Sequence, residues 1–343
     1  MDYKTILPYI EKRLVSEQVH PENENLRIFN YTQMCQFSQE WDEITRACRG
    51  LIIDISTDEV IARPFPKFFN YMEMVNKEMP LPVGEMVIQE KLDGSLGILY
   101  ELNGLPYIAT RGSFASDQAK WATEWYRKHV NILPNKDETN LFEIIYPANR
   151  IVVAYDFSGL VHLSTRRTSD GQELDTKWSE PILTAKIIPN TSLEELSKLD
   201  EPNSEGFVVF YPKSNERLKI KFPEYVKLHK IMTGLSEIGI WEMLKEEKDV
   251  IEIIKDAPDE MHSWVKKVVS SILEQFVDIE RMATQVEMQA KKFTTRKEQA
   301  EIITKSQYAG VVFSMLDNKN YKDVIWKLVR PRGQHTFKVD IDQ

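Results

Sequence analysis

The stretch Lys91-Leu92-Asp93-Gly94-Ser95 constrains the fold of this chain more than any other. It lies between two apolar runs, residues 86–88 and 96–100, each of which is typical of a buried strand. Asp-Gly favours a tight turn, so the pattern predicts a strand, a short turn and a second strand. Such a turn would hold the lysine amine at the end of the first strand, where it can point into a pocket.

A lysine held in this way can act as a nucleophile. An amine attacks phosphorus only after losing its proton, so it must lie where burial or neighbouring cations disfavour its charge. The spacing K-x-D-G is typical of a lysine that becomes covalently linked to a nucleotide. The motif is short, however, and Asp-Gly most often only turns a hairpin, so the pentapeptide alone leaves both interpretations open.

Two carboxylates occur at strand-like positions further along the chain. Glu143 lies inside the apolar run 142–146, and Glu205 immediately precedes the apolar run 206–210. Each has a structural alternative, because Glu143 could pair with a nearby lysine and Glu205-Gly206 could form a turn. Behind a K-x-D-G motif, the two carboxylates favour a site for a nucleotide and its metal ion.

Three cations accompany these carboxylates. Lys219 and Lys221 alternate with apolar residues, so they project from the same face of a predicted strand. Two ammonium groups on one face repel each other, and a bound anion would remove that cost. Arg111 follows the first predicted hairpin. The alternative for the lysines is a solvated strand face.

Taken in order, these motifs resemble those of ATP-dependent RNA ligases of the bacteriophage RNA ligase 1 family, within the covalent nucleotidyltransferase superfamily. The resemblance extends over about residues 41–230, with a weaker similarity at 291–314. The segments that carry it are 46–51, 66–70, 91–95, 142–143, 147–152, 205–208, 219–221 and 225–229.

The resemblance implies a role for each matched residue. Lys91 would be the nucleophile that takes AMP from ATP, and Lys219 and Lys221 would contact the α-phosphate as further catalytic residues. Glu205 would hold the divalent metal ion, and Glu143 would bind the ribose hydroxyls. The remaining nucleotide-binding positions would be Arg49 and Lys67 at the ATP phosphates, Arg111, and the residues beside the nucleophile, Glu90, Asp93 and Gly94.

The implied reaction has three steps: formation of lysyl-AMP, transfer of AMP to an RNA 5′-phosphate, and attack by an RNA 3′-hydroxyl. ATP would be the co-substrate, with Mg²⁺, or alternatively Mn²⁺, because the available ligands are hard oxygens. Lys219, Lys221 and the metal would lower the pKa of Lys91 by repulsion. The expected partner is RNA, as single strands or broken tRNA anticodon loops, and a separate end-healing enzyme is a further expected partner.

Other functions remain open at this point. A DNA ligase or a capping-type nucleotidyltransferase usually carries an arginine two residues after the motif glycine, where this chain has Leu96, and appends an OB-fold barrel. A non-enzymatic RNA-binding protein could have kept the fold and lost the chemistry. A metabolic enzyme with an accidental K-x-D-G is the third alternative.

The composition limits the cellular setting and the kind of RNA contact. With a net charge of −9, the chain of 343 residues is not a generally basic nucleic-acid binder. The cations are local: residues 212–230 hold six Lys or Arg and two Glu, and residues 319–338 hold six and one Asp. Two cysteines, no recognisable signal peptide and no long apolar run predict a cytoplasmic protein, in the host cytoplasm if viral, without membrane contact.

We expect an α+β nucleotidyltransferase domain with antiparallel sheets over residues 1–236, followed by an all-α domain over 237–343. In the first domain, residues 2–17 favour a helix broken at Pro8, and residues 115–130 a helix with an aromatic core stripe. Strands are predicted within 49–62, 141–154, 159–165 and 205–222.

In the second domain, residues 264–288 have the spacing of an amphipathic helix that starts near Asp256. Residues 237–255 and 296–316 each predict a helix. Lys291, Lys292, Arg296 and Lys297 cluster near a helix boundary, as an RNA contact or as a solvated face. By analogy with the family, this domain is a candidate RNA-specificity module.

Overall fold

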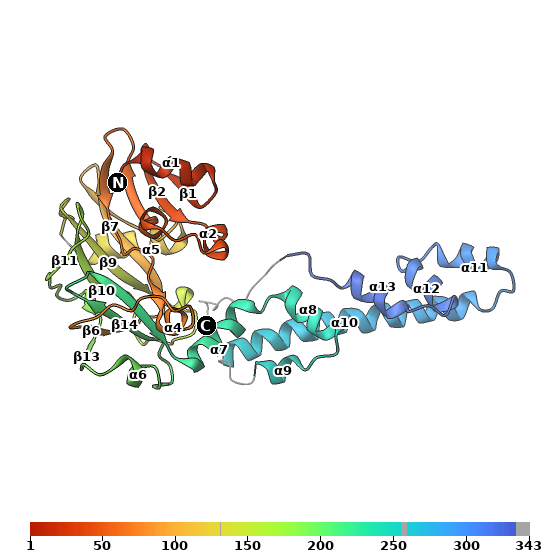
Figure 1. The fold of residues 1–343 in the computed structure, drawn as a ribbon. Helices are drawn as coiled ribbons and strands as arrows, with labels where there is room; N and C mark the ends of the chain where they lie inside the picture. The colour runs from red at the N-terminus through yellow and green to blue at the C-terminus, as the bar shows by residue number, and fades with distance from the viewer. Residues whose placement is uncertain (131, 255–258, 334–343) are drawn as a thin grey trace. The chain divides into compact units, whose positions relative to one another are not determined.

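The computed structural model describes residues 1–130, 132–254 and 259–333, which form two compact units (Figure 1). The first unit runs from Met1 to Lys227, and the second begins at Leu228. The division falls within helix α7 (Pro223–Gly234), whereas the predicted boundary at 236/237 follows that helix.

Three β-sheets build the first unit. The first has the order β1-β2-β3-β4, the second β11-β10-β9-β7-β8 with β12 beside β10, and the third β13-β6-β14-β15-β5. Neighbouring strands are antiparallel except for the pairs β10/β12 and β15/β5.

The strands of the first sheet are β1 (Val15–His20), β2 (Asn23–Tyr31), β3 (Arg49–Asp54) and β4 (Glu59–Ala62). Those of the second are β7 (Ser95–Leu102), β8 (Leu105–Ala109), β9 (Glu138–Ile145), β10 (Gly159–Arg167), β11 (Glu173–Leu174) and β12 (Leu183–Thr184). Those of the third are β5 (Phe69–Asn70), β6 (Val87–Glu90), β13 (Ile187–Ile188), β14 (Gly206–Tyr211) and β15 (Glu216–Lys221).

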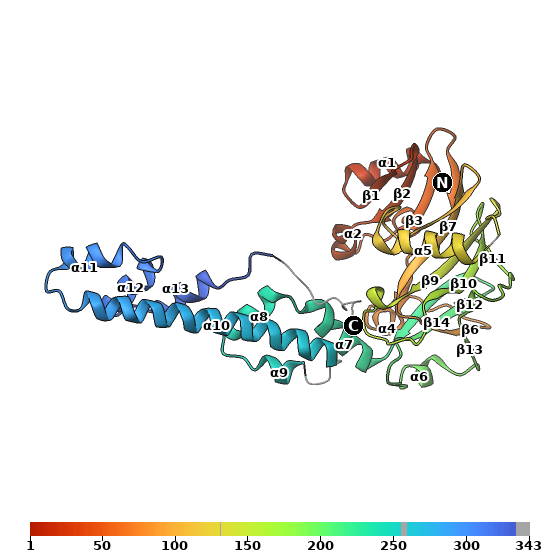
Figure 2. The ribbon, with the colours of Figure 1, turned by 180° about the vertical axis from the view of Figure 1, so that it is seen from behind.

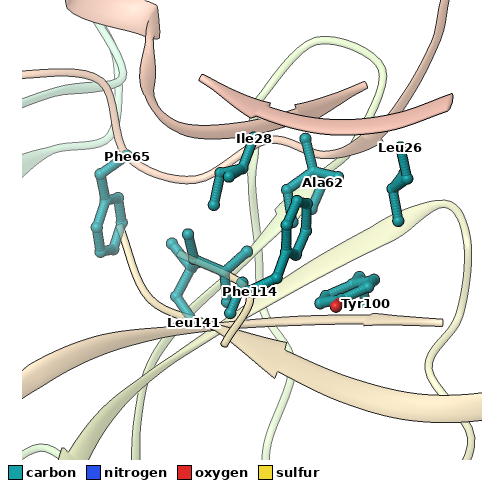
Figure 3. Packing of buried hydrophobic residues seen from close by; sticks show 10 residues of the cluster. Leu26, Ile28, Ala62, Phe65, Tyr100, Phe114 and Leu141 are labelled. Carbon is teal, nitrogen blue, oxygen red and sulfur yellow. The ribbon is translucent and has the colours of Figure 1, made fainter. Parts of the chain in front are cut away.

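The second sheet has apolar side chains on both faces, since consecutive buried residues of its strands point to opposite faces. Ile98 and Tyr100 on β7 pack against Leu26 and Ile28 of the first sheet, as Figure 3 shows for this cluster. Leu99, between them in sequence, packs on the opposite face in a cluster that includes residues of helix α5 (Asp117–His129). The sheet is therefore the central layer of the first unit.

Short helices complete the first unit (Figure 2). They are α1 (Tyr3–Glu11), α2 (Gln33–Ser38), α3 (Glu43–Ala47), α4 (Tyr71–Asn76), α5 (Asp117–His129), the 3₁₀ turn η1 (Pro147–Asn149) and α6 (Leu193–Leu196). The predicted helix over 115–130 is confirmed as α5, with Ser116 as its N-cap. Its aromatic stripe belongs to the core, because Tyr126 is buried and Trp121 and Trp125 pack against the same cluster.

Every regular element among the described residues of the second unit is a helix. They are α8 (Glu237–Lys245), α9 (Val250–Ile253), α10 (Asp259–Ala290), α11 (Arg296–Ile303), α12 (Ala309–Leu316) and α13 (Tyr321–Leu328). Helices α8, α11, α12 and α13 pack against the long helix α10. The predicted fold class, α+β with antiparallel sheets followed by helices, is confirmed, as is the long amphipathic helix.

Three predicted helices differ from the structure. Pro8 lies inside α1 and does not break it; the segment instead leaves the helix at Arg13, whose φ is +60°, and continues as β1. The described residues 237–254 contain two helices where one was predicted, because Glu247 has a left-handed φ of +55° and Asp249 caps a new start. Residues 296–316 are likewise divided into α11 and α12. The predicted start near Asp256 lies outside the described residues.

The cysteines and the helices bear on the predictions about redox state and membrane contact. Cys35 and Cys48 are buried and make no disulfide, and Cys48 packs in the core beneath β3. None of the helices in the described part of the chain has the length and apolar character needed to cross a lipid bilayer.

Candidate functional site

The third sheet places Lys91 beside Glu205. Lys91 follows β6 and Glu205 precedes β14, and the Lys91 backbone N–H donates to the Gly206 carbonyl at 2.9 Å. The Lys91 Nζ donates to Glu205 Oε2 at 2.8 Å. Lys221, at the end of neighbouring β15, binds the other carboxylate oxygen, Oε1, also at 2.8 Å. One carboxylate that is 3% exposed therefore bridges two of the predicted catalytic lysines.

Gly206 makes this approach possible. Its φ is +135°, a region in which side-chain-bearing residues are strained. A Cβ at this position would lie 2.0 Å from the carbonyl oxygen of Ile220 on β15. The glycine therefore lets β14 and β15 close around Glu205.

Hydrogen bonds to the Asp93 side chain fix the bend that follows Lys91. The Asp93 Oδ2 accepts hydrogen bonds from the backbone N–H groups of Val152 and Val153, each at 2.8 Å. Its Oδ1 accepts from the Tyr225 hydroxyl at 2.7 Å, and the side chain is 3% exposed. With both oxygens occupied by the protein, Asp93 anchors the loop that carries the lysine.

Gly94 and Glu143 form the opposite wall. The Gly94 N–H donates to Glu143 Oε1 at 2.9 Å, and a Cβ on Gly94 would lie 2.5 Å from the Ile144 carbonyl oxygen. Glu143 belongs to β9 and faces Leu96 of β7 in the central sheet. Burial, reinforced by the charges of Glu205 and Asp93, raises the pKa of Glu143 to about 8, although Lys91 acts in the opposite direction.

Without nucleotide or metal, the pKa of Lys91 is shifted in the direction opposite to the predicted lowering. Burial lowers its pKa, but the carboxylates of Glu205 and Glu143 outweigh burial, so the pKa is raised above the ordinary lysine value. The lowering by Lys219, Lys221 and the metal, expected for the site with nucleotide bound, stays a prediction. The physical reason for the raised pKa is that the Glu205 carboxylate lies 2.8 Å from the Lys91 amine and also binds Lys221.

Lys219 is the unneutralised partner on the same strand. Leu218 and Ile220 are buried on one face of β15, and Lys219 and Lys221 are half-buried on the other, as the alternation predicts. Lys219 makes no ion pair among the described residues. Burial, together with the positive charges of Lys67, Lys91, Arg49 and Lys221, lowers its pKa well below the ordinary value.

Arg49 and Lys67 extend this positive group. Arg49 and Lys219 lie over the same ring, with Arg49 Cζ 5.4 Å and Lys219 Nζ 5.7 Å from the centre of Phe68. Arg49 Nη1 is buried without a hydrogen-bond partner. Lys67 Nζ lies 4.9 Å from the centre of the Phe69 ring, and burial lowers its pKa. The charge of Glu73 acts on Lys67, but neither Arg49 nor Lys67 makes an ion pair among the described residues. Such clustered cations are suited to a polyanion.

Arg111 joins the group from the loop after β8. Its Nη1 donates to the Tyr31 hydroxyl at 3.1 Å, and the charge of Arg111 contributes to lowering the pKa of Lys67, after burial. Gly50, with a φ of +92°, lies against the Arg111 backbone, where a Cβ would approach Arg111 Cα to 3.3 Å. The first sheet thus positions both Arg49 and Arg111.

Glu90 has a different environment. Its Oε1 accepts a hydrogen bond from the Lys186 backbone N–H at 2.8 Å, and its own N–H donates to the Lys186 carbonyl at 2.9 Å. Glu90 therefore joins β6 to the segment before β13. A nucleotide role for Glu90 stays a prediction, whereas the other predicted residues converge around Lys91 or hold its loop.

Several residues that hold the Lys91 loop or contact the cations had no predicted role. Tyr225 and Tyr155 hold Asp93, since the Asp93 N–H donates to the Tyr155 hydroxyl at 2.8 Å. Asn149 accepts a hydrogen bond from the Ser95 hydroxyl at 3.0 Å. The Phe68 ring lies beneath the cations of Arg49 and Lys219. Tyr225, Asn149 and Phe68 lie in the resembling segments, which was the available signal.

The cation cluster predicted in the second unit is partly neutralised. Lys291 pairs with Glu287 at 2.8 Å, and Arg296 pairs with Asp317 at 2.5 Å. Lys292 and Lys297 are exposed. Of the four predicted cations, Lys292 and Lys297 therefore remain the candidates for an RNA contact, with a solvated helix face as the alternative.

The model of one protein family, described as RNA ligase, matches residues 47–225. A putative RNA ligase of Thermovibrio ammonificans is 29% identical over 212 residues, which cover 57% of this chain and 56% of that protein. The RNA ligase of Rhodothermus phage RM378 is 23% identical, and the match covers 71% of this chain and 72% of that protein.

A putative bifunctional polynucleotide kinase/RNA ligase of Autographa californica nuclear polyhedrosis virus is 29% identical, over 60% of this chain and 34% of that protein. Among solved structures, an archaeal ATP-dependent RNA ligase is 14% identical with a TM-score of 0.47, over 80% of this chain and 78% of that one. The match thus spans about half the length of the Thermovibrio ammonificans protein and about a third of the length of the viral protein.

The fold and site define a protein with a half-buried lysine that is bound by a carboxylate and lies near a group of cations that make no ion pair among the described residues. The chain belongs to the RNA ligase family, of the bacteriophage RNA ligase 1 type.

Proposed function

We propose that this protein is an ATP-dependent RNA ligase that joins RNA 5′-phosphate and 3′-hydroxyl ends. The observation that carries the proposal is the arrangement around Lys91: its amine is held by Glu205, and it faces Lys219, Arg49 and Lys67. A nucleophile on one side and uncompensated positive charge on the other suit attack on a polyphosphate.

In the first step, Lys91 Nζ attacks the α-phosphorus of ATP. An N–P bond forms, the bond to the β-phosphate oxygen breaks, and pyrophosphate leaves with its electron pair. The amine must first give up a proton, and its 2.8 Å ion pair with Glu205, whose own pKa is lowered, opposes that loss in the protein without nucleotide. Lys219 would meet the α-phosphate, while Arg49, Lys67 and Arg111 would meet the departing phosphates.

In the second and third steps, the RNA 5′-phosphate oxygen displaces Lys91 from the AMP phosphorus, and the RNA 3′-hydroxyl then attacks the activated 5′-phosphate. AMP leaves, and a phosphodiester bond remains. Lys219 and Lys221 lie where they can neutralise the phosphate charge throughout. Glu143, protonated or sharing a proton at neutral pH, would bind the ribose hydroxyls.

The donor set fits a metal ion only in part. Among the described residues no group of three or more His, Cys, Asp or Glu could hold one, and both Glu205 oxygens are bound by lysines. Mg²⁺ is commonly bound through one or two carboxylates together with substrate phosphates and water. Glu205 would therefore hold a divalent ion, Mg²⁺ or Mn²⁺, that arrives with ATP, and that ion would supply charge neutralisation.

Nucleotide and acceptor choice separate this proposal from a DNA ligase or a capping-type enzyme. The protein would be incubated with α-labelled ATP or GTP, then analysed on a denaturing gel. Label from ATP but not GTP supports the proposal, and label from GTP favours capping. The labelled protein would then be offered nicked tRNA anticodon loops, linear single-stranded RNA and nicked duplex DNA. Sealing of DNA nicks alone would contradict an RNA ligase.

We further propose tRNA repair in the cytoplasm as the setting, with the helical second unit as the RNA-specificity module. Relatives named RNA ligase, including one named as a fusion with a polynucleotide kinase, support an RNA-repair role. An end-healing partner enzyme would then supply the 5′-phosphate and 3′-hydroxyl. Sealing of RNA that bears 2′,3′-cyclic phosphate without such a partner would contradict that requirement.

A further inference from the structure

A second group of cations in the first unit lies outside the residues assigned to the nucleotide. Arg46, Arg63 and Arg166 line a pocket of about 400 Å³, formed by α3, the segment after β4 and the turn after β10. No lysine or arginine of the Lys91 site lines this pocket. The two groups of cations therefore serve different spaces.

Each of the three guanidinium groups is fixed by backbone carbonyls. Arg46 Nε donates to the Lys67 carbonyl at 3.2 Å, and Arg63 Nε donates to the Thr168 carbonyl at 2.7 Å. The Nη atoms of Arg46 and Arg63 have no partner among the described residues. Carbonyl groups orient a guanidinium without cancelling its charge, so the outer nitrogens remain available to an anion.

Arg166 is the most buried of the three, with 4% of its surface exposed. Its Nη1 donates to the carbonyl of Pro64 and its Nη2 to that of Gly171 at 2.6 Å, while its Nε is buried without a partner. Burial, followed by the positive charge of Arg217, lowers the pKa of Arg166 to about 9. The carbonyl groups hold Arg166 at the pocket without cancelling its positive charge.

One carboxylate of the pocket lining, Asp170, acts on Arg63 and Arg166 through its charge, but it forms no ion pair with them among the described residues. Asp42 accepts hydrogen bonds from the Tyr9 hydroxyl at 2.6 Å and the Thr45 N–H at 2.8 Å. Asp170 pairs with Arg167 at 2.7 Å. Glu43 is exposed at the start of α3. Among the described residues, none of the three makes an ion pair with Arg46, Arg63 or Arg166.

The pocket adjoins the Lys91 site through Lys67. The backbone carbonyl of Lys67 binds Arg46, whereas its ammonium lies 5.3 Å from the ring centre of Trp41, another residue of the pocket lining. Lys67 thus separates the two groups of cations. An anion in the pocket would lie beside the ATP phosphates and yet would belong to a different molecule.

We propose that this pocket binds a phosphodiester group of the RNA during the joining reaction. The inference rests on the proposed ligase function and adds the place where the RNA backbone is held. Guanidinium groups match phosphate with paired hydrogen bonds, which lysines do not. ATP is the other source of phosphate, and two half-reactions distinguish the sources.

The test uses Arg46→Gln, Arg63→Gln and the double variant of the full chain. Protein adenylylation by ATP is measured without RNA, and joining of 5′-adenylated RNA is measured without ATP. We expect adenylylation to stay within about twofold of wild type, because the pocket lies outside the nucleotide site. The KM for RNA should rise about tenfold in the double variant, and the salt slope should fall by about 1 to 2, as for lost phosphate contacts.

Arg127→Gln is the matched control. Arg127 Nε donates to the Pro106 carbonyl at 2.9 Å, and its guanidinium lies 4.2 Å from the centre of the Tyr107 ring. Arg46 is held similarly, by a carbonyl and by Phe69 at 5.9 Å, so both changes remove one charge from a stacked arginine. The control variant should join RNA with an unchanged KM and salt slope.

Three results would overturn the proposal. A parallel loss of adenylylation would assign the pocket to ATP or to folding, and thermal unfolding would separate those two. An unchanged KM and salt slope in both single variants would show that RNA does not use the pocket. An equal effect of Arg127→Gln would reduce the inference to general charge. Failure of wild type to form lysyl-AMP would instead refute the proposed function.

Discussion

The Lys91 amine and the Glu205 carboxylate form a 2.8 Å ion pair across two strands of the third sheet, although 114 positions separate them in the sequence. Lys221 binds the second oxygen of the same carboxylate. The nucleophile is therefore held as a protonated, oriented amine before nucleotide binds, and its reactivity depends on how firmly Glu205 keeps it charged.

The first prediction concerns the pH dependence of adenylylation. The attacking amine must be neutral and its pKa is raised, so the rate with ATP should increase as pH rises above neutrality. Glu205→Gln removes the strongest of the charges that raise this pKa, and burial then lowers it. The pH profile should shift to lower pH even if its plateau falls. A single-turnover pH series measures this, with exposed Glu59→Gln as control; an unshifted profile would contradict it.

Lys219→Met should separate stability from activity. Lys219 is half-buried among cations with its pKa well below normal, so the charged form destabilises the fold and an apolar residue should raise the Tm. Adenylylation should fall about 100-fold or more, as when a charge-stabilising donor is removed. Calorimetry of the unliganded protein and single-turnover labelling check both results.

Lys221→Met is the contrasting variant on the same strand. It deprives the buried Glu205 carboxylate of one of its two partners, so the Tm should fall. If both lysine variants change the Tm in the same direction, the distinction between a neutralised and an unneutralised lysine is wrong.

Asp93→Asn should unfold the loop that carries Lys91. Both Asp93 oxygens accept hydrogen bonds, so an amide nitrogen at either position would face a donor. We expect a loss of about 3 kcal/mol in the free energy of unfolding and a matching loss of adenylylation. Urea denaturation checks this, with exposed Asp137→Asn as control. An Asp93→Asn protein that keeps its stability would remove Asp93 from this anchoring role.

Glu143 should make the protein less stable as pH rises. Its pKa in the folded protein is raised to about 8 from a value near 4.5 when unfolded. The unfolded chain therefore loses this proton first, and the contribution to stability, complete below pH 4.5, is lost as pH rises toward and through 8. Glu143→Gln should flatten the fall in Tm between pH 5 and 8. An identical fall in wild type and variant would contradict the raised pKa.

Local patterns predicted the elements that carry the site. The alternation around Lys219 and Lys221 predicted β15 and its two faces, because period is a local property. Asp93-Gly94 predicted a tight turn, but these residues form a bend that leads from β6 in the third sheet to β7 in the second. The break at Glu247 was missed, since nothing in the neighbouring apolar spacing signals a left-handed residue in that position.

Contacts between distant residues were less accessible. The charge state of Lys91 before nucleotide binds could not be predicted, because the sequence shows Glu205 and Lys221 without showing that one carboxylate binds two amines. The arginine pocket was missed for the same reason: Arg46, Arg63 and Arg166 come together only when the first and second sheets pack.

The central claim is that Lys91 becomes covalently linked to AMP. The most direct measurement is peptide mass spectrometry of the protein after incubation with ATP and Mg²⁺, beside a Lys91→Arg variant. We predict the added mass of one adenylyl group on the peptide that contains Lys91, lost in the variant and absent with GTP. An unmodified Lys91 peptide, or the same added mass on another lysine, would contradict the account.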